Sequence, residues 1–352
     1  MKVVTKIVGL SLCLAASVSF FASCGGSSGI TLMQHGGLTG PDLDNLAKTA
    51  VKTFVTAYPK PQIFKGDQAI KKIGILGFET ISGYAPGGAA QLVGSVDKAS
   101  SFATDDYAGQ FNEYEPGRQI MLPLWKYRQE ATDGMLKVLT DKLAENGFEV
   151  IPSDQVCKAS QYMNLGKEAE SPRPDHFIHQ FYAIHLGKSE PPIKCNAGGL
   201  REYSGSLLSQ NIIHQQEWMN ALAQESGADA FIIVTNYISY TTERKYDEQT
   251  GKRNGSVSVI PILQMVVPNS KMMAAAQANK VKILGLMKGM NLNLGTWQIE
   301  KGISGSYEVL SKFGAGDEGT QAVGESFKKS ATELYQFVGN LLAKKIRMDL
   351  SL

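Results

Sequence analysis

Three short apolar runs constrain the fold of this 352-residue chain most strongly. They lie at residues 73–78, 148–151 and 231–234. Apolar runs of this length between turn residues are typical of buried strands. Helical patterns stand between them, over residues 122–145 and around Trp218, and stop at Gly147 and Gly227. Strands that alternate with helices predict an α/β (α+β) fold, in which a mixed β-sheet is flanked by helices.

Amphipathic helices are predicted near both ends of the mature chain. Apolar residues recur at helical spacing from Leu43 to Val55, and the pattern ends before Pro59. A second helix is predicted over residues 325–347, with basic residues in its last turns, where cations favour the helix dipole. We expect both helices to pack an apolar face against the sheet.

Beyond residue 234 the apolar period changes to two, which predicts late antiparallel hairpins. The first joins residues 231–242 to a return strand over 256–267, where Pro261 indicates a bulge or a sheet edge. The second is predicted to join residues 281–292 to 296–307 through a turn at 293–295. No internal repeat is evident.

Two long segments interrupt this scaffold. Residues 79–120 are rich in Gly, Ser, Ala and Asp and lack sustained periodicity, whereas residues 153–213 contain several prolines. We expect residues 41–352 to form a single domain with insertions at about 79–120 and 153–213. The Gly/Ser-rich residues 24–40 are predicted to be a flexible tether before it.

Residues 1–23 have the pattern of an export signal. Lys2 and Lys6 precede an apolar stretch of about 15 residues, shorter than the roughly 20 of a spanning helix. The junction that ends at Cys24 resembles the lipobox of bacterial lipoproteins, which implies a diacylglycerol and an acyl chain such as palmitate on Cys24. Phe21 stands where an aliphatic residue is usual, and a non-lipidated signal cleaved near Ala22 is the alternative. Gly25 after the cysteine implies sorting to the outer membrane.

Two cysteines remain in the folded part, Cys157 and Cys195. In an oxidising compartment they predict one disulfide, which would close a loop within the second insertion and stabilise it by about 3 to 4 kcal/mol. Two reduced buried thiols or a metal pair are the alternatives. The spacing of the two cysteines matches no zinc pattern.

Three of the five histidines, His176, His179 and His185, lie within ten residues of one another. On a helix His176 and His179 would share a face, and Asp175 could complete a Zn or Cu site. We favour a polar loop in which these histidines pack and form hydrogen bonds, because no distant ligand is identifiable. We therefore expect no metal cofactor.

Motifs of enzymes are present only in unsuitable contexts. Residues 314–319 match G-x-G-x-x-G, but two carboxylates stand inside the motif and no βαβ unit surrounds it. Ser95-x-x-Lys98 and Ser326-x-x-Lys329 match the pattern of acyl-serine enzymes, without the accompanying Lys-Thr-Gly. The sequence therefore predicts no enzyme and no evident small-molecule substrate.

The charge balance also argues against a nucleic-acid partner. Lys2 and Lys6 are the only charged residues before Cys24, so the mature chain has 33 basic (35 minus 2) and 33 acidic residues. A formal charge of zero gives no attraction to nucleic acid or anionic lipid. Membrane attachment is then expected from the acyl chains on Cys24.

The order of these elements resembles the small α/β lipoproteins related to the TolB N-terminal domain, a group that includes the curli-secretion (CsgG-type) lipoproteins. The similarity covers roughly residues 68–78, 122–152, 215–310 and 325–347, without the two insertions. Its most specific pieces are Gly227-Ala228-Asp229-Ala230 before a buried strand and the hairpin with Trp297. It implies a TolB N-terminal-like sheet used for docking or assembly in the cell envelope.

Our leading hypothesis is a lipid-anchored outer-membrane protein that acts as a non-catalytic docking component of an envelope complex. The membrane would be its partner through the lipid, together with an envelope protein or another copy of the chain. We expect it on the periplasmic face rather than the cell surface. The alternatives are a secretion-pore subunit of the curli-secretion type, whose two long strands have the 9 to 11 residues of a membrane strand, and a metal-binding or surface adhesin lipoprotein.

Overall fold

The computed structural model describes most of the chain beyond the export signal. The described residues are 30–31, 40–54, 61–84, 125–166, 168–169, 171–174, 193–203, 212–242, 252–283, 288–299, 302–310 and 317–351. Cys24, the three clustered histidines and Ser95-x-x-Lys98 lie outside these residues. The predictions made for them are therefore not addressed by the fold.

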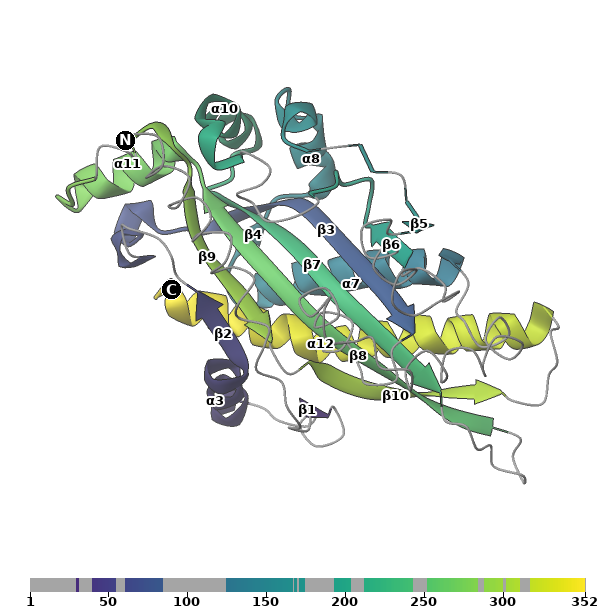
Figure 1. The fold of residues 1–352 in the computed structure, drawn as a ribbon. Helices are drawn as coiled ribbons and strands as arrows, with labels where there is room; N and C mark the ends of the chain where they lie inside the picture. Colours follow the sequence, from purple (N-terminus) through teal and green to yellow (C-terminus); the bar gives the residue numbers. More distant parts are fainter. Residues whose placement is uncertain are drawn as a thin grey trace, which may run out of the picture.

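The structure confirms a mixed α/β architecture (Figure 1). The helices with more than one turn are α3 (Gly40–Ala50), α7 (Trp125–Glu145), α8 (Ser153–Lys158), α10 (Gln216–Ser226), α11 (Asn269–Ala278) and α12 (Asp317–Asp349). The strands are β1 (Ile30–Thr31), β2 (Val51–Phe54), β3 (Lys72–Tyr84), β4 (Glu149–Val150), β5 (Arg173–Pro174), β6 (Ile193–Asn196), β7 (Ala230–Thr242), β8 (Lys252–Val267), β9 (Leu292–Ile299) and β10 (Ile303–Leu310).

All the described strands belong to one sheet with the order β1-β10-β8-β7-β3-β6-β5. In addition β4 pairs with β3, and β9 pairs with both β2 and β8. The central pair, β3 and β7, is parallel, as is β3 with β4 across the helix α7. The pairs of β8 with β7, β9 and β10 are antiparallel. The sheet is therefore mixed, as the sequence predicts.

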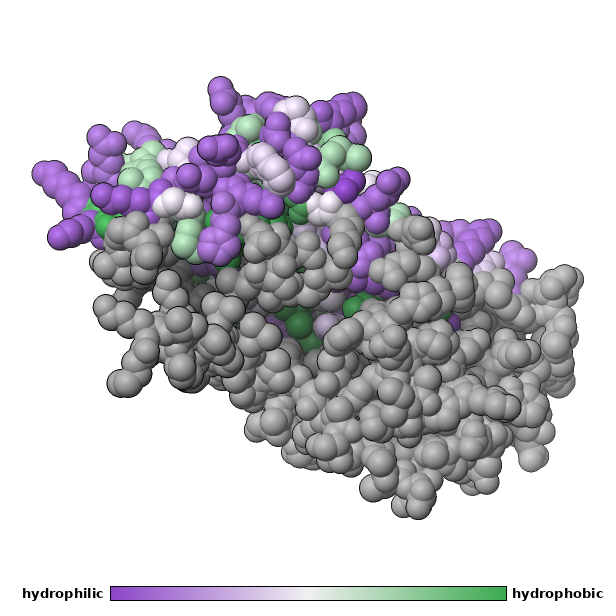
Figure 2. Space-filling model, turned by 45° about the horizontal axis from the view of Figure 1, so that its top comes forward, coloured by the Kyte–Doolittle hydropathy of each residue, from purple (hydrophilic) through white to green (hydrophobic). Residues whose placement is uncertain are grey.

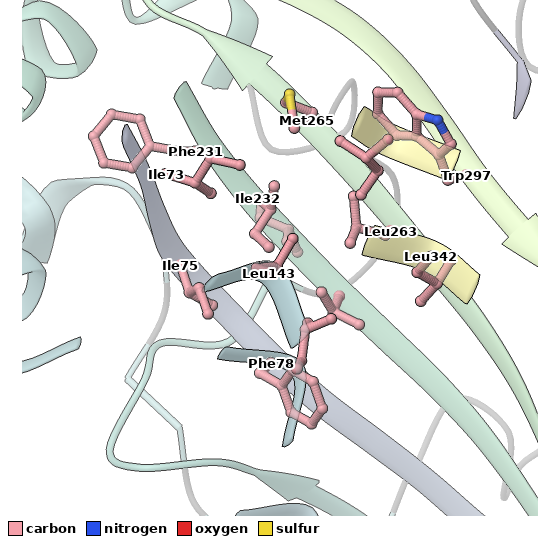
Figure 3. Packing of buried hydrophobic residues seen from close by; sticks show 14 of the residues in the cluster. Ile73, Ile75, Phe78, Leu143, Phe231, Ile232, Leu263, Met265, Trp297 and Leu342 are labelled. Atoms are coloured by element: carbon pink, nitrogen blue, oxygen red, sulfur yellow. The ribbon is translucent and has the colours of Figure 1, made fainter. Parts of the chain in front are cut away.

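One face of the sheet packs against α7 and α12, which also pack against each other (Figure 1). Ile73, Ile75 and Phe78 point to this face, and the Phe78 ring meets Tyr335 of α12 edge-on at 5.9 Å between ring centroids. Figure 3 shows them in one cluster with Leu143 and Leu342 from the two helices. Apolar burial on this face is the main stabilising contribution to the fold.

The opposite face is approached closely at two glycines of β3. A Cβ atom at Gly74 would lie 2.7 Å from the Phe231 ring and 3.3 Å from Val156 of α8. A Cβ atom at Gly77 would lie 2.6 Å from the Tyr203 ring. The glycines in the run Ile73–Phe78 thus allow the second insertion to pack directly on the sheet.

The three helices predicted at residues 122–145, near Trp218 and at 325–347 are confirmed as α7, α10 and α12. Gly227 ends α10 in the left-handed conformation, with φ of 75°. The last helix begins earlier than predicted, at Asp317, and includes the end of the Gly-rich motif. Lys329 of the second acyl-serine pattern is exposed on it and pairs with Glu333 at 3.9 Å.

The predicted helix over residues 43–55 is wrong beyond Ala50. There the chain continues as β2, because Val51 to Phe54 pair antiparallel with Ile299 to Thr296 of β9. Val51 is buried in the core in either conformation. The strand forms although its apolar residues have helical spacing, because over so few residues the spacing cannot distinguish a helix from a strand.

The second predicted hairpin is also wrong. Its predicted turn at residues 293–295 lies inside the continuous strand β9, which pairs with β2 and β8, and β9 and β10 follow one another along the same edge of β8. The helix α11 occupies part of the preceding segment, where no helix was predicted. Pro261 is neither at a bulge nor in an edge strand, since it pairs with Asn236 of β7. On the other side of β8, however, Pro261 has no partner strand, because the pairing with β10 ends at Val259 and the pairing with β9 begins at Ile262. Its missing N–H is tolerated at this local gap.

Both predicted insertions differ from the structure: the first begins later than predicted, and the second packs into the core. The strand β3 continues to Tyr84, so residues 79–84 belong to the sheet and not to the first insertion. The described parts of the second insertion contribute core residues, among them Val156, Tyr162, Leu165, Leu200 and Tyr203. This insertion is therefore built into the main domain rather than being a separate excursion.

Candidate functional site

The most unusual group of side chains lies where β3, β6 and the segment after β6 meet. Lys194 Nζ is 2.9 Å from Glu79 Oε2 and 3.1 Å from Glu202 Oε1, and the three side chains are only 5 to 7% exposed. Thr235 of β7 donates a hydrogen bond to Glu79 Oε1 at 2.8 Å. We call Glu79, Lys194 and Glu202 the buried ion cluster.

Strand register places this cluster on the face opposite α7. Thr80 faces α7, since its hydroxyl is 2.6 Å from that of Thr132, so the neighbouring Glu79 points to the other face. Glu79 lies across from Asn196 on β6 and beside Thr235 on β7. Lys194, two residues before Asn196, is therefore on the same face, where it can pair with Glu79.

Burial dominates the electrostatics of the cluster. It raises the pKa of Glu79 above its ordinary value, and the nearby negative charge of Glu202 adds to this, while the charge and hydrogen bond of Lys194 oppose it. For Lys194, burial alone would lower the pKa, but the two carboxylates raise it overall. The lysine therefore stays charged at neutral pH and holds together the carboxyl groups of Glu79 in β3 and of Glu202 in the segment after β6.

Polar atoms without partners surround the cluster. The side-chain amide of Asn196 and the hydroxyl of Tyr203 are buried and find no hydrogen-bond partner within the described part of the chain. Arg201, which precedes the cluster residue Glu202, donates to the Gly166 carbonyl at 2.9 Å through Nε. Tyr162 bridges the strand and the insertion, because its hydroxyl donates to the Leu76 carbonyl and accepts from the Arg201 N–H, each at 2.8 Å.

The buried ion cluster thus fixes the segment 193–203 across the face of β3. One lysine between two carboxylates is an ion pair network rather than an arrangement for nucleophilic chemistry. Its chemical capacity is proton uptake at Glu79 as the pH falls. We interpret it as the element that holds the described segment 193–203 of the second insertion on the sheet.

The structure contradicts the predicted disulfide between Cys157 and Cys195, since both are free. Cys195 is buried on β6 between Thr80 and Thr132, on the α7 face, and burial raises its pKa to about 12. Cys157 lies on α8 near Tyr162, whose hydroxyl accepts from the Arg201 N–H on the face of the sheet opposite α7. Burial raises the pKa of the Cys157 thiol too. The sheet stands between the two thiols, and the ion cluster and the tyrosines order the insertion instead.

The predicted metal site cannot be placed, because His176, His179 and His185 lie outside the described residues. Elsewhere in the described ranges, no three His, Cys, Asp or Glu side chains gather in a way that could hold a metal ion. Among the described helices, none combines the length and apolar character that crossing a membrane requires.

The two most specific pieces of the resemblance have structural roles. Asp229 accepts hydrogen bonds from the backbone N–H groups of Lys71 and Lys72 at 2.9 Å each, and its carboxylate pairs with Lys271 at 2.8 Å. It thereby aligns the start of β3 with that of β7. The indole of Trp297 is buried and donates to Asp349 of α12 at 2.8 Å.

Sequence reasoning missed Glu79, Lys194 and Glu202. Their signal was weak: Ile193-Lys194-Cys195-Asn196 alternates apolar and polar residues as strands do, whereas Glu79-Thr80-Ile81-Ser82 does not. A charged residue in a strand pattern normally indicates a face exposed to solvent, unless an oppositely charged partner can be identified. The partner here is distant in sequence and only the fold brings it close.

Comparison with known proteins gives no relatives. No family model, curated protein or solved structure matches the chain.

Proposed function

We propose that this chain is a lipid-anchored outer-membrane protein that acts as a non-catalytic docking component of an envelope complex, with a TolB N-terminal-like sheet as its scaffold. The export-signal pattern that ends at Cys24 supports the anchor. The mixed sheet, with its parallel centre β3–β7 and antiparallel flank, is compatible with the scaffold. The envelope partner is another protein or a second copy.

One observation carries the docking role. The described part of the second insertion is fixed on the sheet by the buried ion cluster and presents Met163, which is 58% exposed, beside Arg201. Among the side chains that the structure describes, it is the one large hydrophobic side chain that is exposed. Figure 2 shows that the described side chains on the viewed face are mostly hydrophilic, with isolated hydrophobic ones between them. Met and Arg are among the residues enriched in protein–protein interfaces, and here the two side chains lie together on a segment that is held on the sheet.

The secretion-pore alternative is less well supported by the position of the long strands. Residues 231–239 of β7 lie between β3 and β8, and their alternate side chains are buried towards α12. Forming a membrane strand from this segment would expose part of the core to lipid and separate it from α12. A docking role requires no such rearrangement.

Site-specific photo-crosslinking in intact cells tests the docking role. A photoreactive amino acid at Met163 is expected to give a discrete cross-linked species, whereas the same group at the exposed Lys137 of α7 is expected to give none. Mass spectrometry of the species distinguishes another envelope protein from a second copy. Equal cross-linking from both positions, or none from Met163, would contradict the proposal.

A further inference from the structure

The short strand β1 lies at the edge of the sheet, a few residues after Cys24. Ile30 and Thr31 pair parallel with Ile303 and Ser304, the first two residues of β10. On its other side β10 pairs with β8. Two residues of the segment expected to be a free tether therefore belong to the sheet.

This pairing reduces the largest possible distance between an anchor on Cys24 and the folded domain. An uncommitted tether from Cys24 to Gly40 has 16 steps (40 minus 24) and could extend to about 58 Å. From Cys24 to Ile30 there are only six steps (30 minus 24), which reach about 22 Å at most. The start of β10 is one strand spacing, about 5 Å, further on.

We propose that β1 clips the anchor to the sheet edge, so that the side of the domain with β1 and α3 is held against the membrane and the side with α8, α10 and α11 faces away. This inference rests on the lipidation of Cys24 in the proposed function. Figure 1 shows α8, α10 and α11 along one border of the molecule, and α3 and β1 along the opposite border. Met163, just beyond α8, would then be turned towards a partner in the aqueous compartment.

The exposed charges of α3 are balanced, which suits contact with headgroups that carry no net charge. Its exposed charged residues are Asp42 and Lys48, one of each sign, followed by Lys52 in β2. Lys344 of α12 neutralises Asp44 at 2.6 Å. The acyl chains and the short leash, rather than electrostatic attraction, would determine the orientation.

Energy transfer to labelled lipids tests this orientation. The full-length lipidated protein is reconstituted in phosphatidylcholine vesicles that carry a headgroup acceptor dye, and a donor is attached through a non-canonical amino acid at Lys48 of α3 or at Glu217 of α10, both exposed. Transfer is expected to be several-fold more efficient from Lys48. Equal transfer from the two positions would overturn the proposal.

A pair of insertions provides the matched control. About ten Gly and Ser residues placed between Gly26 and Ser27 lengthen the leash before β1, and should lower transfer from Lys48 strongly. The same insertion between Gly36 and Gly37, after β1, should leave it unchanged. An equal loss with both insertions would mean that β1 does not hold the anchor.

Vesicle flotation and mass spectrometry of the N-terminus separate failure of the orientation from failure of the anchor. Protein that carries lipid and floats but shows no difference between Lys48 and Glu217 contradicts only the clip. Protein that carries no lipid on Cys24 and does not float contradicts the anchor as well, and the proposed function with it.

Discussion

At the scale of single residues, the buried ion cluster is the feature that departs most from an ordinary core. Replacing a complete buried ion pair by apolar residues is often neutral, whereas removing one partner leaves a buried charge without compensation. Lys194 is the sole cation placed on both Glu79 and Glu202 by the described contacts. Its removal is therefore the most informative single change.

We expect Lys194→Met to lower the free energy of unfolding by about 3 to 5 kcal/mol, because the buried Glu79 carboxylate would lose the cation that pairs with it. Urea unfolding of the mature domain measures this. Lys137→Met provides the control, since Lys137 pairs with Asp141 at 2.7 Å while 77% exposed, and the change is expected to be within about 0.5 kcal/mol. Similar effects of the two substitutions would contradict the stabilising role of the cluster.

The raised pKa of Glu79 predicts a particular pH dependence. Below its ordinary pKa of 4.5 the carboxyl is protonated in both the folded and the unfolded chain. Between 4.5 and the higher pKa of the folded state, the folded chain binds more protons, so its stability falls as the pH rises through this window. We expect Glu79→Gln to remove this part of the slope.

Urea unfolding at a series of pH values, for the wild type and for Glu79→Gln, checks this expectation. The difference between the two curves isolates Glu79 from Asp154 and Glu225, whose pKa values are lowered by hydrogen bonds and which act in the opposite direction. Parallel curves would mean that the pKa of Glu79 is the same in both states.

At the scale of elements, local pattern predicted helices well and strand partners poorly. The helices α7, α10 and α12 have long apolar faces and turn residues at their ends, and the sequence contains both signals. The turn predicted at residues 293–295 lies inside β9 instead, because Asn-Leu-Gly is typical turn chemistry and only the pairing of β9 with β2 and β8 shows that the strand continues through it. Likewise the helical spacing of Val51 and Phe54 carries no information about the distant β9.

The close approach of the second insertion to β3 predicts an effect at Gly77. A methyl group there would lie 2.6 Å from Cδ2 and 3.1 Å from Cε2 of the buried Tyr203 ring, and the Arg201 carbonyl is at 3.3 Å. We expect Gly77→Ala to destabilise the domain by about 1 to 3 kcal/mol through overpacking. Urea unfolding measures the change.

Gly289→Ala is the matched control, because nothing lies within 4 Å of a Cβ atom at that position. It is expected to be neutral or slightly stabilising. If Gly77→Ala were as stable as Gly289→Ala, the segment around Tyr203 would have to be free to move away from the sheet.

At the scale of the whole molecule, the sequence predicted the mixed sheet and its helical cover but not the candidate site. Apolar runs and helical faces report burial, which determines layers. The ion cluster instead depends on Glu79 being 115 residues (194 minus 79) from its lysine, and on β6 pairing antiparallel with β3. The disulfide was predicted from the presence of two cysteines in an expected oxidising compartment, and neither premise shows that the sheet separates the two thiols.

Asp349, near the end of α12, links this helix to the strands β2 and β9. Its Oδ2 accepts hydrogen bonds from Thr53 of β2 at 2.7 Å and from the fully buried Trp297 of β9 at 2.8 Å, and Lys345 donates to the same oxygen at 2.7 Å. Asp349→Ala would leave the indole N–H buried without an acceptor. Together with the lost charged hydrogen bonds, this is expected to reduce stability by about 2 to 4 kcal/mol.

Thr53→Val removes only one of these donors and is expected to cost about 1 kcal/mol, while Asp349→Asn, which keeps an acceptor oxygen, should fall between the two. Urea unfolding ranks the three variants, and limited proteolysis reports whether the end of α12 becomes accessible in Asp349→Ala. Loss of this link would loosen the end of α12 where it meets β2 and β9. A variant Asp349→Ala as stable and as protease-resistant as the wild type would show instead that apolar packing alone holds α12 in place.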